Sequence, residues 1–354
     1  MIYSLLADSN MYFISLHAEC ALHLYSREFF HNDIISDARN IKGIYCKKLN
    51  ADILKNIYDY IYEDKDICID FERIEEISEN NLLGFVSFIK KEFCSKNKSV
   101  YFLNLNKKIY DNMNISDIFC AIEDDKEHIS GKIGKRENVD TYINLMKRKA
   151  RLFEEKVENI IIAATEPYAN EQHTSVPVYL SKYINVKKMI ESNSRFIRLA
   201  IYYLALKMID RGIISNNPLE NNNLSLFFHT INGGYIATQL AGLFHIDFVY
   251  LDHLGPIESV HRKHFEKSIR DNRNYIIISD VICLGGEVGR AKTIIEYCGG
   301  KVRGEVSFVD IKSIQSEKLD DRISLYTISK ECNRIGYTIK TDLCEMCERR
   351  NTNE

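Results

Sequence analysis

The stretch Ile276-Ile277-Ile278-Ser279-Asp280-Val281-Ile282-Cys283-Leu284-Gly285-Gly286-Glu287 decides the fold that we expect for the C-terminal half of the chain. It opens with a continuous apolar run, which is typical of a strand buried on both faces of a parallel sheet. The strand delivers the carboxyl group of Asp280, and Gly285-Gly286 then forms a turn before the next predicted helix. Ligands of open α/β sheets bind at such loops, beyond the carboxyl ends of the strands. We therefore expect a ligand loop over 279–287.

Apolar strands and helical patterns alternate around this stretch. Gly212 ends a strongly apolar helical pattern, and Ile160-Ile161-Ile162-Ala163-Ala164 has the length and continuous apolarity of a buried strand. The expected strands span 160–164, 224–230, 246–251, 275–279 and 302–309, and the expected helices span 195–211, 235–244 and 288–297. Strands that alternate with helices predict an α/β fold with a doubly wound parallel sheet.

A second loop with ligand-binding chemistry is Asn232-Gly233-Gly234, which follows the strand expected at 224–230. Glycines let backbone N–H groups approach a bound anion, and the N-terminus of a helix favours phosphate. A plain turn between a strand and a helix also uses glycine. Both readings stay open at the level of sequence.

The N-terminal half contains a second α/β pattern. Ile67-Cys68-Ile69-Asp70-Phe71 is a short apolar strand, and Ser78 or Asn80 can cap the helix that follows it. A second strand is expected at 99–104 and a second helix at 107–119. This β-α-β-α order predicts parallel strands with helical crossovers.

The length of the chain predicts two domains. It has 354 residues, whereas one domain typically has about 150. Residues 123–149 are charged, contain glycine and are poor in apolar residues, which is typical of a domain boundary. We predict an N-terminal domain over 1–125, a linker over 126–149 and a C-terminal domain over 150–354.

Charge and hydropathy limit the expected partners. Lys and Arg number 47 against 50 Asp and Glu, so the formal net charge of −3 provides no global basic field for nucleic acid or an anionic membrane. No apolar stretch approaches the roughly 18 residues of a membrane span, and residues 1–10 lack the pattern of a signal peptide. The sequence predicts a cytoplasmic protein without a membrane partner, and a homo-oligomer is compatible with it.

The cysteines predict reduced thiols rather than a metal site. Ten are scattered along the chain, mostly inside apolar runs, as is typical of buried thiols in a cytosolic protein. Only Cys344-Glu345-Met346-Cys347 has a zinc-like spacing, and it lacks a second ligand pair. No metal ligand is assigned.

The loop at 279–287 resembles the ribose-phosphate loop of type I phosphoribosyltransferases. That loop reads apolar strand, two acids, Val, two variable residues, Thr, Gly, any residue, Thr, and the likeness extends over roughly 158–311. The resemblance implies that Asp280 binds ribose hydroxyls, that the Gly285-Gly286 turn holds a phosphate, and that Asn232-Gly233-Gly234 contacts a diphosphate. It also implies Mg²⁺ as a cofactor that accompanies phosphoribosyl diphosphate.

Three positions of the loop depart from that family. Ser279 stands where the first acid is expected, and Leu284 and Glu287 replace the two hydroxyl residues that surround the phosphate. An ionised Glu287 about 4 Å from a phosphate would repel it by roughly 1 to 4 kcal/mol. Glu287 is therefore a stabilising charge at a helix N-terminus, a ligand for a hydroxyl or a metal, or a sign that catalysis is lost.

The connection 252–274 corresponds to the mobile loop that closes over the reacting centre in that family. Arg262 and Lys263 are the candidates to neutralise a departing diphosphate. The alternative is that they lie on a solvated helix face over 259–270. Asp252 and His229 stand at strand ends and are candidates to point into the same cleft, although a strand-end histidine is more often structural.

Residues 66–124 resemble a STAS-like regulatory domain of the anti-sigma-antagonist type. In that pattern, a strand ends in an acidic-aromatic pair and a helix begins after a short turn rich in Ser and Asn. The resemblance implies a protein partner for the N-terminal domain. Where many such domains carry a phosphorylatable Asp-Ser pair, this chain has Ser78-Glu79-Asn80-Asn81, so Ser78 is read as a helix cap.

The leading functional hypothesis is an atypical phosphoribosyltransferase-like protein that binds a ribose-phosphate ligand, either phosphoribosyl diphosphate or a nucleotide. An active form would transfer a ribosyl or phosphoribosyl group, a glycosyltransferase reaction, in a bacterial regulatory or defence system. The alternative is a non-catalytic nucleotide sensor or interaction scaffold with the same fold. An RNA-binding regulator that uses the basic residues of 262–270 is a third, weaker reading.

Overall fold

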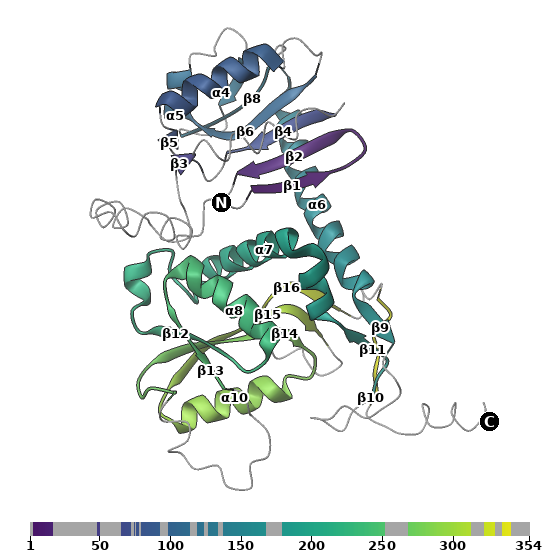
Figure 1. The fold of residues 1–354 in the computed structure, drawn as a ribbon, viewed down its shortest axis with the longest axis vertical. Helices are drawn as coiled ribbons and strands as arrows, with labels where there is room; N and C mark the ends of the chain where they lie inside the picture. The colour runs from purple at the N-terminus through teal and green to yellow at the C-terminus, as the bar shows by residue number, and fades with distance from the viewer. Residues whose placement is uncertain are drawn as a thin grey trace, which may run out of the picture. The chain divides into compact units, whose positions relative to one another are not determined.

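The computed structural model describes residues 3–16, 48–49, 65–71, 74, 76–77, 79–92, 98–113, 119–123, 127–133, 137–167, 179–251, 268–312, 322–329 and 335–340. The chain divides into two compact units, Met1–Lys156 and Val157–Glu354. Figure 1 shows that each unit has its own sheet with helices packed against it. No helix in the described part of the chain is long and apolar enough to cross a membrane.

The N-terminal unit is built on a six-stranded mixed sheet of order β1-β2-β4-β6-β8-β7. The consecutive strands β2, β4 and β6 are parallel, and the other pairings are antiparallel. The strands are β1 (Tyr3–Ala7), β2 (Met11–Leu16), β4 (Asp66–Asp70), β6 (Val100–Asn106), β7 (Phe119–Glu123) and β8 (His128–Ile133), and a short parallel pair joins β3 (Lys48–Leu49) to β5 (Glu76–Ile77). The predicted parallel arrangement of the strands near 67 and 100 is confirmed.

Two helices of the N-terminal unit are α4 (Glu79–Glu92) and α5 (Lys107–Met113). The helix expected over 107–119 therefore ends earlier than predicted, and Phe119 begins β7. Phe119 is 2% exposed, and its ring centroid lies 5.3 Å from that of Phe102. Burial of this ring in the aromatic core, together with pairing to β8, accounts for the strand.

The range 126–149, expected as a linker, contains β8 and the first part of α6 (Val139–Ala163). Gly131 looked like a linker glycine, but a Cβ there would lie 2.4 Å from the Phe119 ring, so its role is close packing within the sheet. Tyr142 of α6 is buried and makes an edge contact with Tyr101 of β6. The division between the units falls inside α6, between Lys156 and Val157.

The C-terminal unit is built on a parallel five-stranded sheet of order β13-β12-β14-β15-β16. The strands are β12 (Leu224–Phe228), β13 (Asp247–Tyr250), β14 (Asn274–Ile282), β15 (Lys301–Ile311) and β16 (Arg322–Ile328). Figure 1 shows α7 (Val186–Asp210) and α8 (Ile231–Phe244) on one side of this sheet and α10 (Gly286–Tyr297) on the other. The predicted α/β class is confirmed.

The sheet core explains why β14 is central. Tyr275 and Ile277 are fully buried and pack against Val288, Ala291 and Ile295 of α10. Apolar side chains surround these positions, which accounts for the continuous apolar run of the sequence there. The carboxyl end of β14 is thereby fixed next to the start of α10.

The strand expected at 160–164 is wrong, because these residues form the end of α6 and the turn after it. Val157, Ile160, Ile161 and Ala164 are buried, whereas Ile162 is 42% exposed. Burial at spacings of three and four residues is the pattern of a helix face. A short apolar run cannot distinguish this pattern from a strand.

Two short antiparallel pairs complete the C-terminal unit. β9 (Thr165–Pro167) pairs with β11 (Lys182–Ile184), and β10 (Tyr179–Leu180) pairs with β17 (Ile339–Lys340). A 3-10 turn, η1 (Pro218–Asn221), precedes β12. The two pairs bring Tyr183 and Tyr337, which are far apart in sequence, to the carboxyl end of the sheet, where both line one cavity.

Candidate functional site

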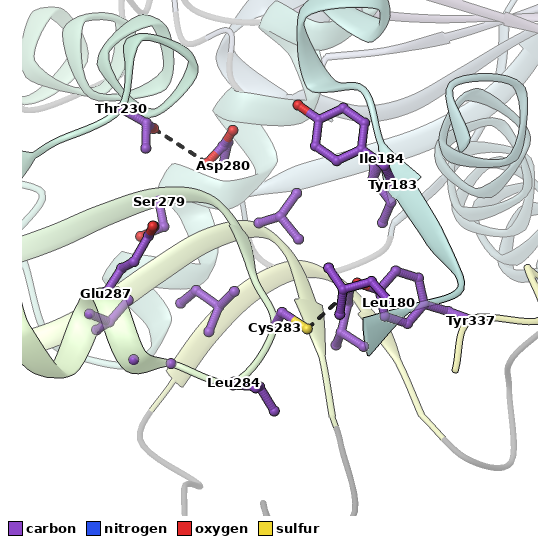
Figure 2. A pocket seen from close by; sticks show the side chains of 16 residues that line it. Leu180, Tyr183, Ile184, Thr230, Ser279, Asp280, Cys283, Leu284, Glu287 and Tyr337 are labelled. Carbon is purple, nitrogen blue, oxygen red and sulfur yellow. Dashed lines mark hydrogen bonds between the residues drawn. The ribbon is translucent and has the colours of Figure 1, made fainter. Parts of the chain in front are cut away.

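A cavity of about 220 Å³ lies at the carboxyl end of β14, within the C-terminal unit. Figure 2 shows Thr230, Asp280, Ser279 and Glu287 on one side of it and Leu180, Tyr183, Ile184 and Tyr337 on the other. The whole loop 279–287 lines the cavity, together with Val288 and Ile311. The cavity therefore has a polar side and an apolar side.

Asp280 is held in position by α8. The amide of Asn232 donates to Asp280 Oδ2 at 3.1 Å, and the Thr230 hydroxyl donates to Oδ1 at 3.4 Å. Thr230 is also the N-cap of α8, where its Oγ1 accepts from the backbone N–H of Gly233 at 3.0 Å. One threonine thus ties the start of a helix to the carboxylate of the neighbouring strand.

The glycines of the second loop allow α8 to pack closely. A Cβ at Gly234 would lie 2.7 Å from the ring of Phe228, and one at Gly233 would lie 3.2 Å from the Ile278 carbonyl oxygen. Both residues are buried in the first turn of α8. The packing requirement of a strand-to-helix turn is sufficient to explain both glycines.

Glu287 lies in the first turn of α10 and faces His229. Its Oε2 is 2.9 Å from His229 Nε2. The His229 side chain is 9% exposed and that of Glu287 is 42% exposed. The other ring nitrogen of His229, Nδ1, is buried and has no hydrogen-bond partner among the described residues. Glu287 is thus oriented by His229, the residue that follows β12, as well as by its own helix.

The turn before α10 depends on Gly285. Its φ is +76°, in the left-handed region, and a Cβ there would lie 2.2 Å from Nη2 of Arg322. Arg322 is itself fixed by Glu305 at 2.8 Å and lies 3.8 Å from Asp310. Burial raises the pKa of Asp310, although Arg322 opposes that effect. The guanidinium is therefore already matched by two neighbouring acidic side chains.

Two further polar groups line the cavity. Ser279 is 3% exposed, and its hydroxyl has no hydrogen-bond partner in the described structure. Cys283 Sγ lies 3.6 Å from the hydroxyl of Tyr337. Burial raises the pKa of the Cys283 thiol, so it stays protonated near neutral pH.

The structure brings together most of the residues predicted from the sequence. Asp280, Glu287, Ser279, Gly285 and Gly286 line one cavity, and Asn232 contacts it through Asp280. The candidates that lie outside the described residues are Asp252, Arg262, Lys263 and the pair Cys344 and Cys347.

Sequence reasoning missed Thr230, Tyr183 and Tyr337 as parts of the site. Thr230 had a detectable signal, because a threonine before Asn-Gly-Gly at a helix start is a typical N-cap. The two tyrosines had none, since their positions follow from the pairing of short strands that are distant in sequence.

No group of three or more His, Cys, Asp and Glu side chains in the described ranges lies close enough to hold a metal ion. Asp280 and Glu287 have other partners, so the described carboxylates fit a resident cation poorly.

Over about half of its length, the chain is similar in fold to solved phosphoribosyltransferases. An adenine phosphoribosyltransferase from Thermoanaerobacter pseudethanolicus is 17% identical and has a TM-score of 0.36, with 49% of this chain and 98% of that chain covered. An orotate phosphoribosyltransferase from Aeropyrum pernix is 14% identical, with a TM-score of 0.35 and coverage of 49% and 94%.

A third structure of this kind is adenine phosphoribosyltransferase from Trypanosoma brucei in complex with AMP, pyrophosphate and ribose-5-phosphate. It is 12% identical, has a TM-score of 0.34, and 56% of this chain and 92% of that chain are covered. No protein-family model and no curated protein matches the chain. At these identities the likeness concerns the fold and carries no information about the ligand.

Proposed function

We propose that the C-terminal unit binds the ribose ring of a nucleoside or nucleotide, with Asp280 accepting hydrogen bonds from the ribose hydroxyls. The observation that carries this proposal is the fixed carboxylate at the cavity. Thr230 and Asn232 orient Asp280, and a carboxylate has about four acceptor sites, so two donors leave capacity for a vicinal diol. Hydrogen bonds to a charged acceptor are also the stronger kind.

The opposite side of the cavity fits a nucleobase. Tyr183 and Tyr337 line it together with Leu180 and Ile184. Pockets for small molecules combine such apolar and aromatic surface with a few fixed polar groups. A base on the apolar side and a ribose against Asp280 would use both sides of the cavity.

Two functions could use this site. The resemblance of the loop to that of type I phosphoribosyltransferases supports group transfer to or from a nucleobase. A non-catalytic nucleotide sensor is the second candidate, and Leu284 favours it because an apolar side chain lines the cavity where the family pattern has a hydroxyl. The transferase and the sensor would both bind the ligand, and only the transferase would also transfer a group.

Isothermal titration of the full chain tests ribose binding. The ligands are the four common ribonucleosides, their 5′-monophosphates, and phosphoribosyl diphosphate with Mg²⁺. Binding of at least one is expected in the wild type, and Asp280→Asn should weaken it at least tenfold, as expected for loss of a charged acceptor. Absence of binding by every ligand would overturn the proposal.

A matched control separates a local effect from a general one. Asp247→Asn makes the same chemical change at the amino end of β13, the edge strand beyond β12, where the side chain is 69% exposed and pairs with Arg273. It should leave the affinity within threefold of the wild type. Formation of a nucleotide and diphosphate from a nucleobase and phosphoribosyl diphosphate would identify the transferase, and binding without turnover would identify the sensor.

The role of the N-terminal unit rests on sequence resemblance alone. We propose that it binds a protein partner, as STAS-like domains do, and that the pair of units serves bacterial regulation or defence. If the two units are linked, the ligand of the C-terminal unit should change the affinity of the N-terminal unit for its partner. This change in affinity should disappear in Asp280→Asn.

A further inference from the structure

We propose that the ligand end next to Leu284 and Glu287 carries an uncharged hydroxyl, so that the site prefers a ribonucleoside to its 5′-phosphate. This inference rests on the proposed ribose binding at Asp280. It concerns the part of the loop that, in the sequence pattern, would hold a phosphate.

The charge lining the cavity is negative. Its lining includes the carboxyl groups of Asp280 and Glu287, and none of the described lining residues is Lys, Arg or His. A phosphate monoester carries nearly two negative charges at neutral pH. Since charges interact more strongly near protein than in bulk water, the two carboxylates oppose its entry.

The N-terminus of α10 does not reverse this sign. A helix N-terminus attracts anions, but the Glu287 carboxylate already stands in its first turn. His229 contacts that carboxylate at 2.9 Å and holds it there. The chain thus provides its own anion at the position where a phosphate would bind.

Arg322 does not supply the missing positive charge either. It lies next to Gly285, but Glu305 pairs with it at 2.8 Å and Asp310 lies at 3.8 Å. The side chain of Arg322 is only 8% exposed. The positive charge of Arg322 is therefore paired with acidic side chains of the fold.

The same residues suit a hydroxyl group. Glu287 is an acceptor that is 42% exposed, and the buried hydroxyl of Ser279 has no partner among the described residues. Leu284 offers an apolar contact in place of a donor. A hydroxymethyl group can donate to a carboxylate and pack its methylene against leucine.

The test compares each ribonucleoside with its own 5′-monophosphate in titrations of the full chain. In the wild type, the nucleoside that binds should have a Kd at least tenfold lower than that of its monophosphate. Glu287→Gln keeps the shape and removes the charge, so the ratio of the two Kd values should shift at least tenfold toward the monophosphate. The nucleoside itself should bind more weakly, because its hydroxyl loses a charged acceptor. The double variant Leu284→Thr with Glu287→Thr should favour the monophosphate.

Glu296→Gln is the matched control, because this exposed residue lies in the last turn of the same helix. It should leave the ratio of the two Kd values unchanged. A monophosphate that binds the wild type as tightly as its nucleoside, and loses binding in Asp280→Asn, would overturn this inference and leave ribose binding intact. Failure of both ligands to bind would overturn the proposed function itself.

Discussion

Gly285 is the residue of the site that the backbone constrains most tightly. Its left-handed φ of +76° disfavours any side chain, and the guanidinium of Arg322 occupies the space a side chain would need. Arg322 cannot easily move because Glu305 accepts from its Nε at 2.8 Å. A glycine is therefore required here whatever ligand the cavity binds.

We expect Gly285→Ala to lower the free energy of unfolding by about 1–3 kcal/mol, from backbone strain together with the displacement of Arg322. Gly289→Ala is the control, because it lies in the same helix with no atom within 4 Å of its added Cβ. It should raise stability by up to about 1 kcal/mol, as alanine does in a helix. Urea unfolding measures both, and equal effects of the two substitutions would contradict this account of the turn.

Site residues could be predicted where the functional side chains lie close together in the sequence. Asp280, Gly285 and Glu287 follow one apolar strand within a few residues, so a sequence pattern finds them. The contact of Asp280 with Thr230 joins positions 50 residues apart and arises from the register between β12 and β14. No local pattern contains that register.

At the scale of elements, the hairpin of β1 and β2 is fixed to α6. The backbone N–H groups of Asn10 and Met11 donate to Asp8 Oδ1, and Arg148 of α6 pairs with the same carboxyl group. Burial raises the pKa of Asp8, but these three donors together hold it below its ordinary value of 3.8. Arg148 also lies over the ring of Phe13, 5.7 Å from its centroid.

This lowered pKa predicts a pH-dependent contribution to stability. An acid whose pKa is lower in the folded state stabilises the fold fully above its unfolded value, and the stabilisation is lost as the pH falls through the folded value. Asp8→Asn keeps an acceptor for the two N–H groups and loses the ion pair, so it should cost roughly 0.5 kcal/mol at pH 7.

Urea midpoints at pH 7, 5, 4 and 3.5 check this prediction. The difference between wild type and Asp8→Asn should shrink below about pH 4. Asp111→Asn, an exposed position on α5, should show no such trend. A difference that stays constant over the whole range would rule out the carboxylate as its source.

Elements were predicted well where the apolar pattern coincides with burial, as for β14 and for most of α8, which was expected over 235–244 and spans Ile231–Phe244. The strand predicted at 160–164 was wrong, because the length of this apolar run suits a strand. Only the burial of residues 157, 160, 161 and 164 reveals a helix. Gly131 was wrongly assigned to a linker. The Phe119 ring that leaves no room for a side chain there belongs to another strand. Such errors come from contacts that sequence spacing does not encode.

At the scale of the whole molecule, two α/β units share one chain, and the site lies within the second unit alone. The length of the chain predicts two domains, and the structure has two compact units. The length could not identify where they divide, because the boundary falls inside one continuous helix. The central claim therefore concerns Val157–Glu354 and can be tested in the intact chain.

That claim is that Asp280 binds a ribose diol, and the most direct measurement compares a ribonucleoside with its 2′,3′-dideoxy analogue by isothermal titration. For the wild type, loss of both hydroxyls should weaken binding by more than about tenfold, because one hydrogen bond to a charged group alone contributes about 1.5–3 kcal/mol. Asp280→Asn should bind both compounds with similar, weak affinity. Equal affinity of the wild type for the two compounds would contradict the claim.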